Sequence, residues 1–278
     1  LKAERPWLGW ARTRDFVDEK KRIRLSAPEP RPDLALRPRR MSVTRVEEWI
    51  RNPYAIFAGQ VLGLEPLAML GQPPDQSLKG GLIHEVLSAF ASKHPAALPQ
   101  NMREDLDMIA QAVLEEYTGH PRIAAFWLPR LARFLDWFAQ TEDERRSATQ
   151  QVLAEISGTL VLNGAAGPFT LSARADRIDD TDAGLIITDY KTGRVPGTKA
   201  VLSGRSPQLP LEAAIANGTA DFPGLAGRRV ASLRYIRASG GEPAGEEATI
   251  KCDDVAGLAA AAQQGLEKLV ARYDDANT

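Results

Sequence analysis

The hydrophobic pattern changes its period close to residue 150, and this change limits the folds that the chain can adopt. Before that point, apolar side chains recur every three or four residues; after it, they alternate or cluster over short lengths between Gly and Asp turns. The first spacing favours amphipathic helices, and the second favours half-buried strands. The sequence therefore predicts an α/β fold with a helical first half, three consecutive strands, a helix, one strand or two, and a closing helix.

The boundaries of these elements follow from caps, prolines and glycines. Ser42 or Thr44 can cap the first helix by accepting from free backbone N–H groups, and Pro53 kinks or restarts that helix. The chain then divides into a helical lobe and an α/β core. The expected lobe covers residues 41–140 with helices at 42–64, 80–94, 102–117 and 121–140; the core covers residues 150–278 with strands at 151–164, 168–179, 184–191, 228–237 and 246–252 and helices at 206–218 and 255–273.

Composition excludes several classes of protein. No run of about 18 apolar residues is present, so we expect no membrane span. The first residues do not resemble a secretion signal, which favours the cytoplasm. The single cysteine, Cys252, excludes an internal disulfide and a four-cysteine metal site. Because the chain does not begin with Met, we expect a segment of a longer protein.

Residues 1–40 are basic and rich in proline. They hold 12 Lys and Arg against 6 Asp and Glu, and four prolines lie between Pro28 and Pro38. Prolines so closely spaced cannot sit inside a helix or a central strand, so residues 26–40 are predicted to be an extended connector within an N-terminal arm or linker of residues 1–40. A basic arm can neutralise phosphates. A solvated linker packed along its own domain explains the same composition equally well.

Charged residues follow an apolar strand without a break. The run Leu185–Ile187 leads directly into Asp189 and Lys191, which share one face because side chains alternate along a strand. Charges at the end of a buried strand are costly unless they are paired or bind a metal. A partner for these charges is expected on the preceding strand.

That partner is Asp176. If Asp179 pairs with Gly184 across the hairpin turn, Asp176 becomes the diagonal neighbour of Asp189, about 7–8 Å away, and two carboxylates at that spacing can share one ion. Oxygen ligands of this kind suit Mg²⁺ or Mn²⁺. An isolated Asp-x-Lys on a hairpin also occurs as a solvated edge with a surface ion pair, and these residues alone leave that alternative open.

Further residues extend the pattern into a known family. A Gly-x-x-x-His helix, an acidic strand residue, Asp-x-Lys in the next strand and a glutamine on the following helix together resemble the RecB-like branch of the PD-(D/E)xK nucleases. The segments SVTRVEEWIRNPYAIFA, GLIHEVL, DYKTG and SPQLPLEAA are similar to the C-terminal nuclease domain of bacterial AddB-type double-strand-break repair proteins. The resemblance implies a restriction-endonuclease-like fold for residues 41–278. Its motif residues are Gly80, His84, Asp176, Asp189, Tyr190, Lys191 and Gln208.

The resemblance also implies a metal centre. His84 would supply an imidazole nitrogen, Asp176 and Asp189 would supply carboxylates, and the carbonyl of Tyr190 would add a ligand to Mg²⁺, with Mn²⁺ as the alternative ion. For His84 alone, a helix histidine satisfied by its neighbours is the competing interpretation. The other two histidines, His94 and His120, have no such company and are expected on the surface.

Three more residues complete the expected catalytic set. By the resemblance, Lys191 would orient or activate the attacking water, and Gln208 would position the DNA backbone or the lysine. Glu155 matches a further glutamate of these nucleases. It could equally be a strand residue paired with an arginine such as Arg174.

The sequence departs from the family pattern at two places. Where many relatives carry a tyrosine four residues after the glutamine, this chain has Glu212. Many relatives also join the N-terminal helix to the C-terminal end with four cysteines around an iron–sulfur cluster, but Asn52 stands where one of these cysteines is expected. We therefore expect no iron–sulfur cluster, and packing of aromatic helices must join those ends instead.

The resemblance implies a metal-dependent DNA nuclease of the exonuclease type. It would act in double-strand-break processing and recombinational repair beside an AddA-type helicase–nuclease subunit. The alternatives are a catalytically silent DNA-binding scaffold and a nuclease that acts alone on RNA or in repair. The loop at residues 192–206 follows the Asp-x-Lys strand and is expected to contact DNA phosphates through Arg194, Lys199 and Arg205.

Overall fold

The structure is a computed structural model, and it describes residues 6–18, 21–23, 29–65, 67, 76–115, 127–218, 222–225 and 227–277. Two compact units are present, Leu1–Arg31 and Pro32–Thr278. The first contains helix α1, Pro6–Asp15. The second contains every other element, including the end of the expected basic arm. His120 and the first part of the expected helix at 121–140 lie outside the described residues.

The helices of the second unit follow the hydrophobic periodicity. The expected break at Pro53 is present, because α2 ends before Asn52 and α3 begins at the proline. Ser42 caps α2 by accepting from the backbone N–H of Arg45 at 3.2 Å. The helical segments are η2 Leu34–Leu36, α2 Val43–Arg51, α3 Pro53–Ile56, η3 Phe57–Val61, α4 Gln76–Lys93, α5 Met102–Glu115, α6 Leu128–Arg146, α7 Thr198–Leu202, α8 Gln208–Ala216 and α9 Val255–Tyr273.

Six strands of the described residues form one mixed sheet. They are β1 Arg40–Ser42, β2 Thr149–Gly164, β3 Gly167–Thr181, β4 Gly184–Lys191, β5 Val230–Ala238 and β6 Gly245–Thr249. β3 pairs antiparallel with β2 along its whole length, while on its other edge it pairs parallel with β1 and antiparallel with β4. β5 joins β4 in parallel and β6 joins β5 antiparallel. The expected α/β fold with a mixed sheet flanked by helices is confirmed.

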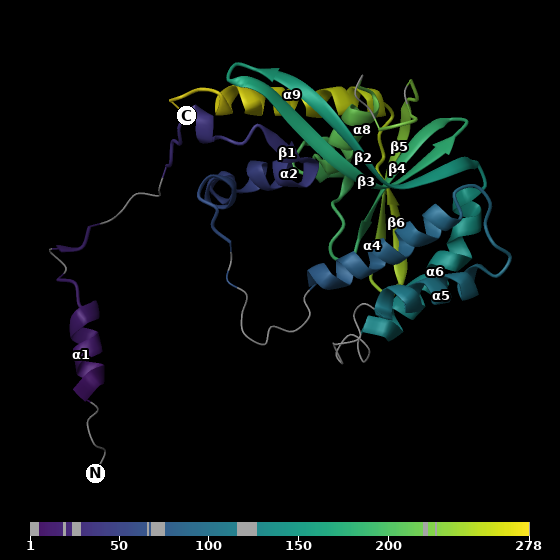
Figure 1. Cartoon of the computed structure of the whole chain (residues 1–278), viewed down its shortest axis with the longest axis horizontal. Helices are drawn as coiled ribbons and strands as arrows, with labels where there is room; N and C mark the ends of the chain where they lie inside the picture. Colours follow the sequence, from purple (N-terminus) through teal and green to yellow (C-terminus); the bar gives the residue numbers. More distant parts are fainter. Residues whose placement is uncertain are drawn as a thin grey trace, which may run out of the picture. The chain divides into compact units, whose positions relative to one another are not determined.

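Helices cover the sheet on two sides (Figure 1). One hydrophobic core lies between the sheet and α2, α8 and α9, and a second lies between the sheet and the lobe formed by α4, α5 and α6. Successive residues of β4 and β5 face different cores: Ile187 and Tyr235 belong to the first, and Tyr190 and Ile236 to the second. Gly158 on β2 lets α8 approach the sheet closely, because a Cβ at this position would lie 2.8 Å from the Ile215 side chain of α8.

The β3–β4 hairpin is tighter than the assumed pairing. Thr181, not Asp179, pairs with Gly184, so the turn contains only two residues. Gly184 has φ +128°, which glycine adopts without strain, and the Thr181 hydroxyl donates to its carbonyl at 2.6 Å. The ladder shifts by two residues, which keeps every side chain on its face. Its last pair is Arg177 with Thr188, so the next two residues, Asp176 and Asp189, stand where the strands diverge.

The two ends of the second unit are joined by aromatic and charged contacts. Trp49 of α2 meets Tyr273 of α9 edge to face, with ring centroids 4.6 Å apart. Arg39 forms an ion pair with Asp274 just after α9. Arg37, which is buried, donates to the carbonyl of Asp275 at 3.0 Å. These contacts join the ends that the expected iron–sulfur cluster of relatives would hold.

Buried charges connect the helical lobe to the sheet. The Arg177 guanidinium of β3 lies 2.7 Å from Glu142 of α6 and 2.6 Å from Asp179, and Arg234 of β5 lies 2.8 Å from Asp179. Burial acts to raise the pKa of Glu142, but the guanidinium groups of Arg177, Arg145 and Arg146 outweigh it and hold that pKa below its usual value. We call Glu142, Arg177, Asp179 and Arg234 the buried ion network. It anchors α6 to two central strands.

The segment that follows β4 is more ordered than a simple loop. It contains the short helix α7, which Val201 anchors by its complete burial. The three cations expected to contact DNA (Arg194, Lys199 and Arg205) are all exposed on this segment. Over the described part of the chain, no helix has both the length and the apolar composition needed to cross a membrane.

Candidate active site

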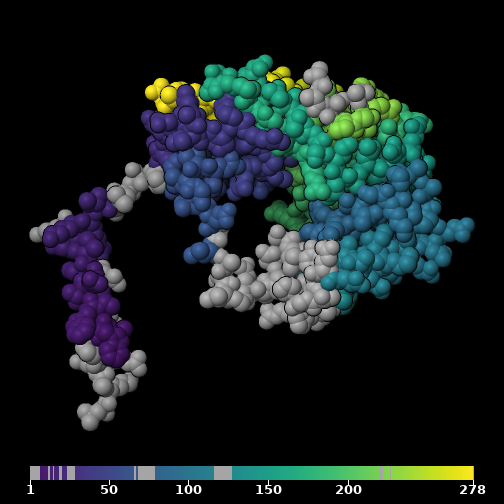
Figure 2. All heavy atoms as spheres, in the orientation of Figure 1, coloured from purple at the N-terminus to yellow at the C-terminus, as the bar shows by residue number. Residues whose placement is uncertain are grey.

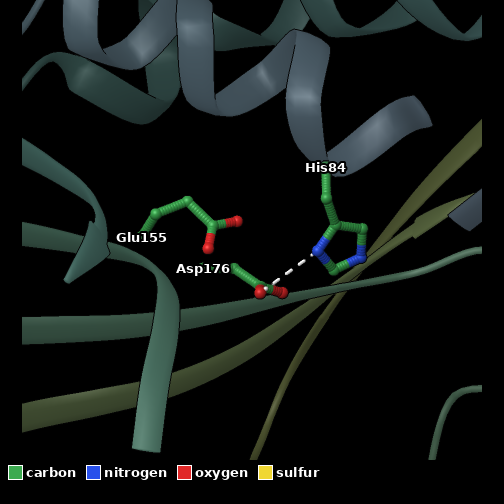
Figure 3. A group of neighbouring side chains, drawn as sticks. All are labelled: His84, Glu155 and Asp176. Carbon is green, nitrogen blue, oxygen red and sulfur yellow. Dashed lines mark hydrogen bonds and ion pairs between the residues drawn. The ribbon is translucent and has the colours of Figure 1, made fainter. Parts of the chain in front are cut away.

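Three side chains from three elements converge between α4 and the sheet (Figure 3). His84 projects from α4, Glu155 from β2 and Asp176 from β3. Each offers one nitrogen or oxygen atom, and these atoms all lie within 4.8 Å of one another. All three residues are only half-buried, so solvent can reach them. One imidazole and two carboxylates at this spacing form a donor set for a divalent ion.

Asp176 and the Tyr190 peptide hold the imidazole of His84. Its Nε2 donates to the Tyr190 carbonyl at 3.0 Å, and its Nδ1 lies 3.2 Å from Asp176 Oδ1. The other oxygen of Asp176 accepts from the Tyr190 backbone N–H at 2.8 Å. Burial acts to lower the pKa of His84, but the hydrogen bond and charge of Asp176, with the charge of Asp189, raise it overall. Protons and a metal ion would therefore compete for this ring.

Glu155 reaches the cluster from a distorted strand. Its flanking residues pair with Arg177 and Ala175, so Glu155 stands opposite Asp176. Its φ is +52°, a left-handed conformation that costs a non-glycine residue about 1–2 kcal/mol. Burial, and then the nearby Asp176 carboxylate, raise the pKa of Glu155, while Arg174 opposes them. The left-handed backbone thus occurs at a residue whose carboxyl group lies close to His84 and Asp176.

Glu155 has two kinds of neighbour. Its carboxylate belongs to the three-residue donor set, and it also lies 2.6 Å from Arg174 Nε. The Arg174 side chain is 68% exposed, so this ion pair is weak and easily broken. Arg174 therefore does not prevent Glu155 from binding a cation.

A second group of residues lies beside the first, on the side of α8. The Lys191 ammonium lies 2.8 and 2.9 Å from the two oxygens of Asp189, and it donates to Gln208 Oε1 at 3.0 Å. The side-chain amide of Gln208 donates in turn to Asp189. Burial, and then the Asp176 carboxylate, raise the pKa of Asp189 to about 6, against the opposing effect of Lys191.

The fold thus brings together every residue expected in the metal and catalytic sets. The two carboxylates have different surroundings, however. Asp176 is held by His84 and a peptide N–H, whereas Asp189 is buried and bound by Lys191 and Gln208. Asp189 does not belong to the compact donor set of His84, Glu155 and Asp176. The roles assigned to the individual residues stay predictions.

A family model agrees with this constellation. The model of the PD-(D/E)XK nuclease superfamily matches residues 40–278. The chain belongs to this superfamily.

The individual relatives of this PD-(D/E)XK chain give less information about its function than the family model does. It is 32% identical over 176 residues to an uncharacterized protein of Rickettsia bellii and 31% identical over 185 residues to one of Rickettsia conorii. Each alignment covers 63% of this chain but only 21% and 22% of those proteins, so the chain spans about a fifth of the length of these relatives. The crystal structure of SSO0001 overlaps 68% of this chain and 85% of its own, with 14% identity and a TM-score of 0.28.

Nucleases of the PD-(D/E)XK superfamily typically use divalent metals, and the donors present fit such an ion. The three ligand atoms come from one nitrogen and two carboxylates, and the site opens to solvent. Figure 2 shows a hollow between the segment near residues 40–65 and α4, with atoms of the green segment that follows β4 at its floor.

Two residues have surroundings that sequence patterns did not reveal. Glu212, noted only as a departure from the family pattern, is buried against Gln208. His94, expected on the surface, is half-buried and forms an ion pair with Asp105 of α5. The only signal for Glu212 is its spacing of four residues from Gln208, which places both on one face of a helix.

Proposed function

We propose that this chain is a metal-dependent nuclease domain that hydrolyses phosphodiester bonds of DNA, with Mg²⁺ as its ion and Mn²⁺ as a substitute. One observation carries the proposal. A half-buried donor set of His84, Glu155 and Asp176 lies next to a lysine that Asp189 and Gln208 hold in place. A solvated surface ion pair would need neither the backbone strain at Glu155 nor the burial of Asp189.

The donor set would bind the ion, with Asp189 and the Tyr190 carbonyl as further ligands. When bound, a divalent ion lowers the pKa of a water ligand and neutralises charge on a phosphate. The chain's own contribution is to present oxygen donors on three strands, β2, β3 and β4, and a histidine on α4. Tyr190 links these parts, because its N–H holds Asp176 and its carbonyl holds His84.

Lys191 would act as a charged donor. Burial acts to lower its pKa, but Asp189 outweighs burial and raises that pKa above its usual value. The ammonium therefore keeps its proton near neutral pH. Its task is then to orient water and to stabilise negative charge that develops on the phosphate, rather than to remove a proton.

The wider context of the proposal rests on the AddB-like segments. By that likeness, the domain would process double-strand ends as part of a cytoplasmic helicase–nuclease, beside an AddA-type subunit, in recombinational repair. Because the chain spans about a fifth of its Rickettsia relatives, those longer proteins have room for further domains, as a nuclease domain at the C-terminal end of an AddB-type protein would require.

Cleavage of labelled DNA tests the proposal. Purified chain is incubated with end-labelled single-stranded and duplex DNA, with Mg²⁺, with Mn²⁺ and with a chelator. We expect cleavage that requires metal and stops on chelation. DNA binding without cleavage under any of these conditions would favour the silent scaffold instead.

Removing the lysine should separate catalysis from metal binding. We expect Lys191→Met to lower the cleavage rate by about 100- to 10,000-fold, because a positioned charged donor is lost. Mg²⁺ should still raise the melting temperature, since Lys191 is not a ligand. Thermal melts with and without Mg²⁺, beside rate measurements, check both points. A variant that no longer responds to Mg²⁺ would contradict this division of roles.

The cations after β4 should contribute to DNA affinity. The test replaces all three residues by Gln: Arg194, Lys199 and Arg205. DNA binding should weaken. The slope of log K against log salt concentration should become smaller in magnitude by about 2 if all three side chains contact phosphates of a single strand. The melting temperature should still rise with Mg²⁺. The matched control replaces Lys251, Lys268 and Arg272, which are exposed near or on α9 and change the net charge equally. Equal slopes for the two triple variants would show that the segment is merely solvated.

A further inference from the structure

Glu212 is a carboxylic acid without a counter-charge of its own. It lies on α8 one turn after Gln208, is 1% exposed, and accepts from Gln208 Nε2 at 3.2 Å. Among the described residues, its Oε2 and the nearby buried hydroxyl of Tyr235 have no hydrogen-bond partner. The rest of α8 is buried and mostly apolar. Packing alone would favour an apolar side chain at this position.

The surroundings of Glu212 make an ionised carboxylate unfavourable at this position. Burial raises its pKa well above the usual value, and the carboxylates of Asp189 and Asp176 raise it further. A buried polar group with an unsatisfied atom costs about 1–3 kcal/mol. No contact described for Glu212 compensates this cost except the one with Gln208. Any role of Glu212 is therefore expected to act through its contact with Gln208.

The hydrogen bonds of Gln208 require one orientation of its side-chain amide. Its carbonyl oxygen accepts from the Lys191 ammonium at 3.0 Å, while its NH₂ group donates both to Asp189 and to Glu212. Rotation of the amide by half a turn would put its NH₂ against the ammonium and its carbonyl against two carboxyl oxygens. With two acceptors, both NH₂ hydrogens are used on one side. A carboxyl oxygen accepts in either protonation state, so this arrangement does not depend on the charge of Glu212.

We propose that Glu212 is a positioning residue that fixes the Gln208 amide and, through it, the Lys191 ammonium. The proposal rests on the nuclease function above, and it assigns the residue that replaces the tyrosine of many relatives. Glu212 touches neither Lys191 nor the donor set in any described contact. It acts through Gln208 alone, and the fold would be at least as stable without its carboxyl group.

The test compares Glu212→Leu, Glu212→Gln, Gln208→Ala and the double variant Glu212→Leu/Gln208→Ala. Glu212→Leu should lower the turnover rate by about 10- to 100-fold, as loss of a supporting hydrogen bond typically does. The KM for DNA and the Mg²⁺-induced rise in melting temperature should stay unchanged, and the metal-free melting temperature should be equal or higher. Glu212→Gln keeps an acceptor of the same shape and should stay within a few-fold of the native rate.

The double variant tests the route of the effect. In the Gln208→Ala background, Glu212→Leu should cause no further loss of rate, because its only target is gone. Additive losses, a lower melting temperature of Glu212→Leu together with its lower rate, or a native rate for Glu212→Leu would each overturn the proposal.

A spectroscopic readout separates this inference from the nuclease proposal. The side-chain NH₂ signals of Gln208, identified by their absence in Gln208→Ala, report the amide directly by NMR. Glu212→Leu should move one of these proton signals upfield and speed its exchange with water; an unchanged signal would overturn the inference. If the native chain cuts no DNA but the signal shifts as expected, the nuclease proposal fails and the positioning of Gln208 by Glu212 stands.

Discussion

Replacing Asp189 by Asn is expected to abolish DNA cleavage while making the metal-free fold more stable at pH 8. Folding raises the pKa of Asp189 from 3.8 to about 6, mainly through burial. A raised pKa means that the native state binds the carboxyl proton more tightly than the unfolded chain does. Its contribution to stability is complete below about pH 4 and is lost as the pH rises through about 6. Asn never ionises, so it avoids a penalty of up to about 3 kcal/mol at pH 8.

Denaturant unfolding at pH 4 and pH 8, with a chelator, measures this difference. The variant should be more stable than the native chain at pH 8 and equally stable at pH 4. Added Mg²⁺ should stabilise the native chain by an amount that grows with its concentration, and stabilise the variant less. Asp182→Asn, at the exposed tip of the same hairpin, is the control and should change stability by no more than about 0.5 kcal/mol. Residual cleavage by Asp189→Asn, or lower stability at pH 8, would remove Asp189 from the active site.

Replacing Arg177 by Met is expected to cause the largest loss of stability, about 3–5 kcal/mol, because it leaves two buried carboxylates without their central cation. Arg177 is 1% exposed and lies within 2.7 Å of Glu142 and 2.6 Å of Asp179. Its aliphatic length is retained in Met, so lost packing contributes little. Urea unfolding at pH 7 provides the measurement.

Arg45→Met is the matched control for Arg177→Met. Arg45 forms an exposed ion pair with Glu48 on α2, and loss of such a pair costs about 0–1 kcal/mol. Arg177→Met should therefore destabilise the chain several-fold more than the control. Similar values for the two variants would mean that water reaches the buried ion network.

Local patterns predicted the elements well, because helices and strands report their period over a few residues. The expected strand at 184–191 and the closing helix at 255–273 coincide with β4 and α9. β1 was not predicted, because three residues are too few to show an alternating hydrophobic pattern. Its pairing with Thr170–Ser172 is set by tertiary contacts alone. The hairpin register was off by two residues for a related reason, since either turn length keeps the same faces buried.

The site residues were recognised by their order along the chain, and the fold brings them together. Their detailed surroundings were not predictable in the same way. The left-handed backbone at Glu155 could not be predicted, because a non-glycine residue within a strand rarely adopts this conformation. Glu142 lies in the charged stretch TEDERR, which is typical of an exposed helix end. In the structure it is buried against Arg177, which lies on a strand 35 residues later. Such pairings depend on long-range geometry that no local pattern encodes.

The topology around β3 also bears on the order in which this chain can fold. β2, β3 and β4 are joined by two short turns, so their pairing closes only small loops, and they carry Glu155, Asp176, Asp189 and Lys191. His84 comes from α4, 92 residues before Asp176, so its docking must close a far longer loop, which costs more entropy and is slower. An incompletely folded chain would thus possess its acidic residues and its lysine without the histidine. Under the proposed function, a nascent or damaged copy would remain harmless to the DNA around it until its last helices dock.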